Sequence, residues 1–235
     1  MNIYADNAAT TTMSPAAIQA MVDCMEHTYQ NPSSFYMSAQ KAKEKLEQAR
    51  AEIAALIGAQ ANEIVFTSGG SEADNQALLS AAAIGERTGK KHIISSAFEH
   101  HAVLHALNRL KKRGFEITLL GVHENGIVDV HELEEALRDD TCLVSIMSVN
   151  NEIGTIQPIS QIGEVCQKRG VLFHTDAVQA VGHMSIDVKA QHIDMLSASA
   201  HKFHGPKGVG FLYARKGVAL TNLIEGGAQE RGKSV

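Results

Sequence analysis

The chain has 235 residues, and its 44% hydrophobic and 20% charged content is typical of one globular domain with a substantial core. A formal net charge of −5, with no run of Lys or Arg, argues against nucleic acid as a partner. No apolar stretch is long enough to cross a bilayer and no signal peptide is visible, so we expect no membrane contact. Three isolated cysteines, Cys24, Cys142 and Cys166, suggest a reducing, cytoplasmic setting.

The first sixty residues are predicted to be an arm and two helices. Residues 1–14 form a short extended N-terminal arm. Ser14-Pro15 is a typical helix start, a capping residue followed by proline, and the helix should run to about His27. A long amphipathic helix is expected from about Ser38 to Ile57, where Gly58 ends it. Residues 15–235 are interpreted as one large domain.

From Glu63 onward, apolar strand-like runs alternate with helical segments. Seven strands are predicted: Glu63–Thr67, His92–Ser95, Glu116–Val122, Leu143–Val149, Val171–His174, Met195–Ala198 and Val209–Tyr213. Four helices lie between them: about Glu72–Gly85, His100–Arg113, Val130–Leu137 and Ser160–Arg169. The alternation predicts an α/β fold with a mainly parallel sheet covered by helices on both faces.

Polar residues that follow these strands should meet at one edge of the sheet, where open α/β sheets bind ligands. Ser68-Gly-Gly-Ser71 is predicted as a tight turn between a strand and a helix, so its backbone N–H groups suit an anion such as phosphate. It is neither a Walker A loop nor a GxGxxG loop. Taken alone, a plain strand–helix turn explains it better.

Histidines and amides follow two further strands. His100 could stack on a planar ligand or simply cap a helix. His101 and His105 lie four residues apart on a predicted helix, but no third ligand is evident nearby, which argues against zinc. Asn150 and Asn151 follow the uniformly apolar strand, where a polar turn is the alternative to a binding role.

The clearest acid and base candidates come later. Asp176 follows an apolar run, where a buried carboxylate needs a cation or a hydrogen-bond donor, and Gln179 is predicted to share a helical face with it. Lys202 lies in a stretch of small residues, where burial would favour a neutral amine able to form a Schiff base. A surface lysine in a turn is the alternative. An anion cradle, a ring, a buried acid and a lysine together suit pyridoxal phosphate (PLP).

These motifs, in this order, resemble cysteine desulfurases of the class V aminotransferase family, which are fold type I PLP-dependent enzymes. The resemblance rests on seven segments: Asp6–Thr11, Thr67–Asn75, Glu99–Val103, Asn150–Gly154, His174–Ala180, Ser199–Gly208 and Gly226–Gly232. It implies the seven-stranded-type large domain of that fold. It also implies PLP as the cofactor.

The resemblance assigns roles to nine residues. Lys202 would bind the cofactor covalently and move protons, Asp176 would pair with the pyridine nitrogen, and His100 would stack on the ring. Gln179 and Asn151 would lie near the phenolic oxygen, Asn151 also near the substrate carboxylate. The phosphate would be held by Gly70, Ser71, Ser199 and His201. Serine stands at Ser71 where threonine is usual, and it keeps the hydroxyl.

The reaction implied is conversion of L-cysteine to L-alanine, with the sulfur left on an enzyme cysteine as a persulfide. That sulfur would pass to an iron–sulfur scaffold or a tRNA-thiolation protein, and the enzyme would be a homodimer. The sequence stops just after Gly226–Gly232, so we expect the persulfide cysteine and the C-terminal small domain to be absent and this chain alone to be inactive. The three cysteines present are interpreted as structural.

Two other functions remain open. One is a different class V PLP enzyme, such as a selenocysteine lyase or a kynureninase-like hydrolase. The other is a non-catalytic partner protein. Among the motifs present, Asn150–Gly154 and Glu99–Val103 favour the desulfurase.

Overall fold

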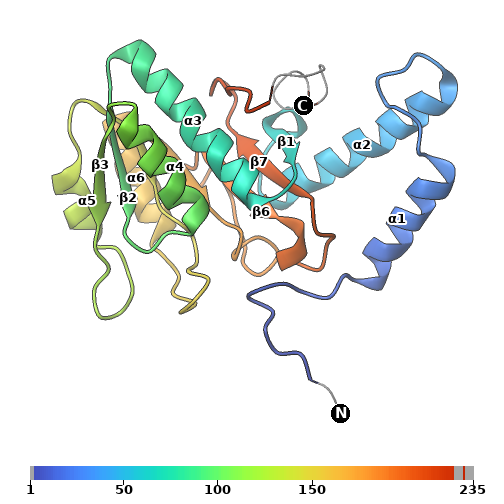
Figure 1. Ribbon diagram of the computed structural model, residues 1–235, viewed down its shortest axis with the longest axis horizontal. Coiled ribbons are helices and arrows are strands. Elements are labelled where there is room, and N and C mark those ends of the chain that lie inside the picture. The colour runs from blue at the N-terminus through green and yellow to red at the C-terminus, as the bar shows by residue number, and fades with distance from the viewer. Residues whose placement is uncertain (1–2, 225–229, 231–235) are drawn as a thin grey trace.

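The computed structural model describes residues 3–224 and 230, and it contains a seven-stranded sheet (Figure 1). The strand order is β1-β7-β6-β5-β4-β2-β3. Strands β2 to β6 are parallel, and β7 is antiparallel to both β6 and β1. The strands are β1 Ile64–Thr67, β2 His92–Ser96, β3 Glu116–Leu120, β4 Thr141–Ser145, β5 Leu172–Asp176, β6 Met195–Ser199 and β7 Gly210–Ala214. The predicted α/β class and the mainly parallel sheet are confirmed.

Helices cover both faces of this sheet. Neighbouring strand residues such as Ile93 and Ile94 point to opposite sides and enter two separate cores. The core that contains Ile93 packs against α3 and α4, and the core that contains Ile94 packs against α2, α5 and α6. The helices are α1 Pro15–His27, α2 Met37–Leu56, α3 Gly70–Thr88, α4 His101–Lys112, α5 Val130–Ala136 and α6 Ile159–Arg169, with short 3₁₀ turns at Ala61–Glu63 and Ala200–Lys202.

Most predicted boundaries lie within two residues of the observed ones, but one strand was predicted too long. The apolar run Leu143–Val149 forms a strand only to Ser145. Beyond it two N–H groups still donate to β5, that of Ile146 to the carbonyl of His174 at 3.2 Å and that of Ser148 to the carbonyl of Asp176 at 2.8 Å. The N–H of Met147, between them, points away and donates to the Glu99 carboxylate at 3.0 Å. The run is mostly apolar because it stays buried as far as Ser148.

The N-terminal arm is attached to the turn that follows β6. The N–H of Thr11 donates to the carbonyl of His201 at 2.9 Å, and the N–H of Ser14 donates to the carbonyl of His204 at 2.9 Å. The arm therefore lies along the loop that carries Lys202. Among the described helices none is long and apolar enough to span a membrane.

A buried arginine ties α2 to the edge of the sheet. Arg50 is 2% exposed, and its Nη1 and Nη2 donate to the two carboxylate oxygens of Glu230 at 2.7 and 2.8 Å. Nη1 also donates to the carbonyl of Ile64 at 2.8 Å, while the N–H of Phe66 donates to Glu230 at 2.9 Å. The guanidinium lies 4.8 Å from the centre of the Phe66 ring. Glu230, the one described residue beyond 224, thus contacts α2 through Arg50 and the sheet through the N–H of Phe66.

Replacing Arg50 by alanine should lower the free energy of unfolding by about 3–5 kcal/mol, because it removes a buried cation and leaves the largely covered Glu230 carboxylate without its partner. The matched control is Arg113→Ala, which breaks an exposed pair with Glu86 and should cost below about 1 kcal/mol. Urea unfolding of the two variants measures both effects. Equal, small losses would show that the buried pair adds no stability.

Candidate active site

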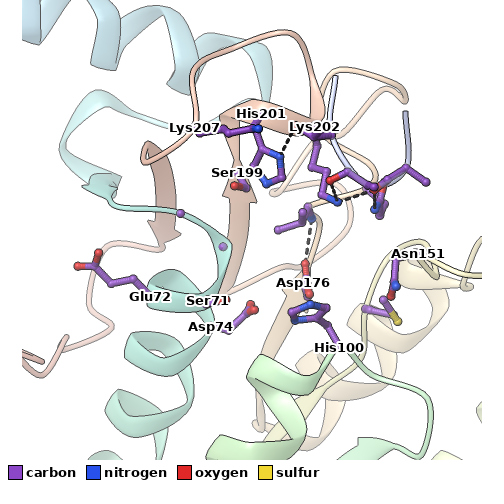
Figure 2. Close-up of a pocket in the computed structure, with 18 of the residues that line it drawn as sticks. Ser71, Glu72, Asp74, His100, Asn151, Asp176, Ser199, His201, Lys202 and Lys207 are labelled. Atoms are coloured by element: carbon purple, nitrogen blue, oxygen red, sulfur yellow. Dashed lines mark hydrogen bonds between the residues drawn. The ribbon is translucent and has the colours of Figure 1, made fainter. Parts of the chain in front are cut away.

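A cavity of about 790 Å³ opens where the carboxyl ends of the central strands meet (Figure 2). All nine residues singled out from the sequence line it: Gly70, Ser71, His100, Asn151, Asp176, Gln179, Ser199, His201 and Lys202. They come from the start of α3, the start of α4, the loop after β4, the end of β5 and the turn that follows it, and the end of β6 and the turn that follows it. The fold thus gathers the residues that the sequence spreads over more than 130 positions.

One end of the cavity is built for an anion. The predicted tight turn at Ser68–Ser71 is wrong in one detail, since α3 already begins at Gly70 and Gly69 is its N-terminal cap. The first N–H groups of this 19-residue helix have no partner within the helix, and its positive end faces the cavity. A Cβ on Gly70 would lie 2.6 Å from Cγ2 of Val178, so only glycine leaves room here.

Side chains after β6 complete this end. An ideal Cβ on Gly69 would lie 3.5 Å from the Ser199 hydroxyl, which places that hydroxyl beside the helix start. His201 lies next to Ser199, and its Nδ1 is 3.0 Å from Oγ1 of Thr10. Burial and the nearby lysines lower the pKa of His201. Lys207 also lines the cavity and adds positive charge to this end.

Lys202 lies on the cavity wall in the 3₁₀ turn that follows β6. Partial burial lowers the pKa of its amine below the ordinary value, although Asp176 and Asp6 oppose this effect. The amine donates to the carbonyls of Ala8 and Ala9 in the N-terminal arm, the latter at 2.9 Å. A lysine of lowered pKa in a cavity is the condition for an amine nucleophile near neutral pH.

The opposite end of the cavity is acidic. Asp176 is the last residue of β5, not a residue beyond it, and it is 4% exposed. Its Oδ1 accepts the N–H of Val178 at 2.9 Å. Burial raises the pKa of Asp176, while the Val178 N–H and the charges of His100 and Lys202 lower it.

One predicted neighbour of Asp176, Gln179, has a different setting from that expected, and Asn151 and His100 make contacts of their own. Gln179 shares no helical face with Asp176, because a turn follows β5 instead of a helix. Its side-chain amide donates to the carbonyl of Ala8 at 2.9 Å. Asn151 lines the cavity and donates to Glu152 at 2.7 Å. His100 caps α4, since its Nδ1 accepts the N–H of Ala102 at 3.2 Å.

Sequence reasoning missed two buried acids at this end. Asp74 was not among the predicted site residues, but it is 1% exposed and lines the cavity. The signal that could have found it is its position between Ala73 and Ala77 on the buried face of α3. Glu99, 5% exposed, lies under the site and accepts the Ser96 hydroxyl as well as the Met147 N–H.

The histidine pair His101 and His105, unlike His100, does not line the cavity. The rings of His101 and His105 lie 5.4 Å apart on exposed positions of α4, and His101 is in edge contact with His100. In the described chain a closer cluster is formed by Asp74, His100 and Asp176, since one carboxyl oxygen of each acid and one ring nitrogen all lie within 4.8 Å of one another. Neither His101 nor His105 belongs to that group.

The geometry defines a class of protein. An anion cradle at a helix start faces a buried carboxylate across one cavity, with a lysine amine of lowered pKa on its wall, as in α/β enzymes that bind an anionic small molecule beside a reactive amine. The aminotransferase class-V family matches residues 3–233. The chain therefore belongs to the aminotransferase class-V family.

Relatives and solved structures agree with this assignment. The chain is 51% identical over 231 residues to cysteine desulfurase IscS of Clostridium botulinum (strain Kyoto / Type A2), covering 98% of this chain and 58% of the relative. It is 52% identical over 229 residues to cysteine desulfurase IscS of Methanosarcina thermophila, covering 97% of this chain and 56% of the relative. The chain thus spans somewhat more than half the length of these relatives.

Two solved structures have nearly the same fold. A NifS-like protein superposes with a TM-score of 0.96 at 40% identity, covering 100% of this chain and 65% of the other. A structure described as SspA in complex with cysteine gives a TM-score of 0.95 at 41% identity, covering 99% of this chain and 67% of the other. At these identities the likeness extends to the sequence as well as to the fold.

The buried acid Glu99 makes a pH-dependent contribution to stability that can be tested. Burial raises its pKa from 4.5 to about 8. Between these values the folded chain binds a proton that the unfolded chain has released. The free energy of unfolding therefore falls as pH rises, by up to about 1.4 kcal/mol per pH unit from this group.

Glu99→Gln should remove that share of the slope between pH 5 and 8, because glutamine resembles the protonated acid. Urea unfolding at several pH values measures the slope, and Glu52→Gln on the exposed face of α2 should leave it as in the parent. A Glu99→Gln variant with the parental slope would contradict a proton on Glu99.

Proposed function

We propose that this chain is the PLP-binding part of a cysteine desulfurase, an enzyme that converts L-cysteine to L-alanine and transfers the sulfur to an enzyme cysteine. The observation that carries the proposal is the single cavity on which all nine anticipated residues lie. The names of relatives about half identical to this chain support it. A related structure described as a complex with cysteine supports L-cysteine as the substrate.

The residues present fit the phosphate of PLP. The start of α3 offers N–H groups at Gly70 and Ser71, and the absence of a side chain at Gly70 keeps the cradle open. The Ser199 hydroxyl and the His201 ring lie beside it, and Lys207 supplies positive charge. A dianionic phosphate is the group that this set of donors would bind best.

The residues at the acidic end fit the ring. A carboxylate buried at Asp176 would hold a protonated pyridine nitrogen, and that charge would in turn offset the cost of burying the carboxylate. His100 would stack on the ring from the start of α4. The amides of Gln179 and Asn151 would lie near the phenolic oxygen, Asn151 also near the substrate carboxylate.

Lys202 would bind the cofactor aldehyde and later carry protons at its Nζ. Its lowered pKa keeps a larger fraction of the amine neutral, which is the form that attacks an aldehyde. To do so it would exchange its hydrogen bonds to Ala8 and Ala9 for the cofactor. When bound, PLP supplies an electron sink that stabilises negative charge at the substrate α-carbon.

Further parts of the proposal concern the whole enzyme. We propose a cytoplasmic homodimer whose sulfur passes to an iron–sulfur scaffold or a tRNA-thiolation protein. A selenocysteine lyase or a kynureninase-like hydrolase would use the same cofactor set, but the desulfurase names of the relatives favour the first reaction. The reaction is tested by incubating the PLP-loaded full-length enzyme with L-cysteine and measuring L-alanine.

Lys202→Ala should abolish covalent cofactor binding. Mixed with PLP, the parent chain should develop a visible absorbance band that survives gel filtration. Borohydride reduction should then make the attachment of the cofactor to the protein irreversible. The variant should show only the spectrum of free PLP. Lys112→Ala, at the far end of α4, is the control and should behave as the parent. A parent chain without the band would refute the cofactor assignment.

The cysteines described here differ in their fitness to accept sulfur. Burial raises the pKa of the Cys142 thiol to about 11 and that of Cys166 to about 12, so both are poor nucleophiles near neutral pH. Cys24 is only half-buried. Iodoacetamide at pH 8 should therefore alkylate Cys24 on the order of 100-fold faster than the other two.

Mass spectrometry of the digested protein measures the three rates. In urea the three rates should become similar, which controls for intrinsic reactivity. Fast labelling of Cys142 or Cys166 in the native protein would contradict their low reactivity and make the labelled residue a candidate sulfur acceptor.

A further inference from the structure

A second carboxyl group stands beside Asp176, and no role above uses it. Asp74 lies on the first turns of α3, is 1% exposed and lines the cavity (Figure 2). One of its oxygens, an oxygen of Asp176 and a ring nitrogen of His100 all lie within 4.8 Å of one another. Two carboxyl groups this close and this deeply buried do not both ionise, so the pair holds a proton.

Hydrogen bonds indicate which member keeps that proton. Asp176 accepts the N–H of Val178 at 2.9 Å, and the positive charge of Lys202 favours its ionised form. Asp74 Oδ1 has no hydrogen-bond partner among the described residues. The carboxylate therefore belongs at Asp176 and the neutral acid at Asp74.

Of the other groups around Asp74, Ser197 opposes this assignment and the rest agree with it. His174 Nε2 lies 3.7 Å from Asp74 Oδ1, but burial lowers the pKa of His174 to about 3, so this ring brings no positive charge. Glu99 adds only negative charge when ionised. His100 favours the ionised form of Asp176, not that of Asp74. A hydrogen bond from Ser197 favours the ionised form of Asp74, against its burial and the charge of Asp176.

We propose that Asp74 is a positioning residue that holds a proton, so that a single negative charge, on Asp176, faces the bound cofactor. This inference rests on the proposed function for the identity of that cofactor. It requires that Asp74 act as a neutral group. Asparagine, which is neutral and has nearly the same shape, should therefore preserve cofactor binding at this position. An ionised Asp74 would instead put two negative charges at one end of the cavity.

The location of the proton can be tested without the cofactor. Carbon-13 NMR of the chain labelled at the aspartate side-chain carboxyl carbon distinguishes a protonated acid from a carboxylate, and the label leaves Glu99 silent. At pH 7 the parent should show one protonated aspartate. That resonance should vanish in Asp74→Asn and persist in Asp176→Asn.

Three results would overturn the proposal: no protonated aspartate in the parent, loss of the resonance in Asp176→Asn, or its persistence in Asp74→Asn. Asp23→Asn on exposed α1 is the control for a resonance lost by substitution alone. If Asp74→Asn does not fold, the spectra of the parent and of Asp176→Asn still decide which acid is protonated.

PLP binding supplies the second readout. At pH 7 the affinity of Asp74→Asn should stay within about threefold of the parent, and that of Asp176→Asn should fall by at least about tenfold. The reverse order would make Asp74 the anionic partner and refute the proposal. A parent chain that binds no PLP refutes the proposed function, whereas the NMR result on Asp74 still stands or falls by itself.

Discussion

The close approach of the start of α3 to the middle of the sheet is the constraint on which the site depends. A Cβ on Gly210, the first residue of β7, would lie 2.4 Å from the carbonyl oxygen of Ala198 and 2.7 Å from Cα of Gly69. Because glycine stands there, the cap of α3 can rest directly on β6 and β7. The helix start and the Ser199 hydroxyl then meet at the same point. The anion cradle is thus produced by backbone packing before any charged side chain contributes.

Charge then divides the cavity along its length. The end near the start of α3 and the turn after β6 holds helix N–H groups, His201 and Lys207, and the acid that lines this end, Glu72, accepts the N–H of Ser68 at 2.6 Å. The end at β5 holds Asp176 with Asp74 beside it. A ligand with an anionic group at one end and a cationic ring nitrogen at the other matches this division. The arrangement also explains why a carboxylate is tolerated at a strand end, since the Val178 N–H and the charge of Lys202 both favour its ionised form.

Much of this was accessible from the sequence, for reasons that differ between residues. Strand order cannot be read from a chain, but the carboxyl ends of parallel strands share an edge, so His100, Asp176 and Lys202 could be grouped in advance. The proposed partnership of Gln179 with Asp176 failed because the residues after β5 form a turn, which a three-residue spacing cannot distinguish from a helix. Asp74 was overlooked because the sequence predicted a helix start at Glu72, and an acid near a helix start has an ordinary explanation. Only the packing of α3 shows that this side chain is buried.

The ion pair between Arg50 and Glu230 connects the end of the described chain to the strand that precedes the anion cradle. Glu230 belongs to the segment Gly226–Gly232, whose remaining residues lie outside the described part, and it accepts the N–H of Phe66. Phe66 lies in β1, three residues before Gly69, the cap of α3. A buried arginine from α2 therefore holds Glu230 against the strand that leads into the anion cradle. The same arginine also donates to the carbonyl of Ile64, the first residue of that strand, so one guanidinium fixes both Glu230 and the start of β1.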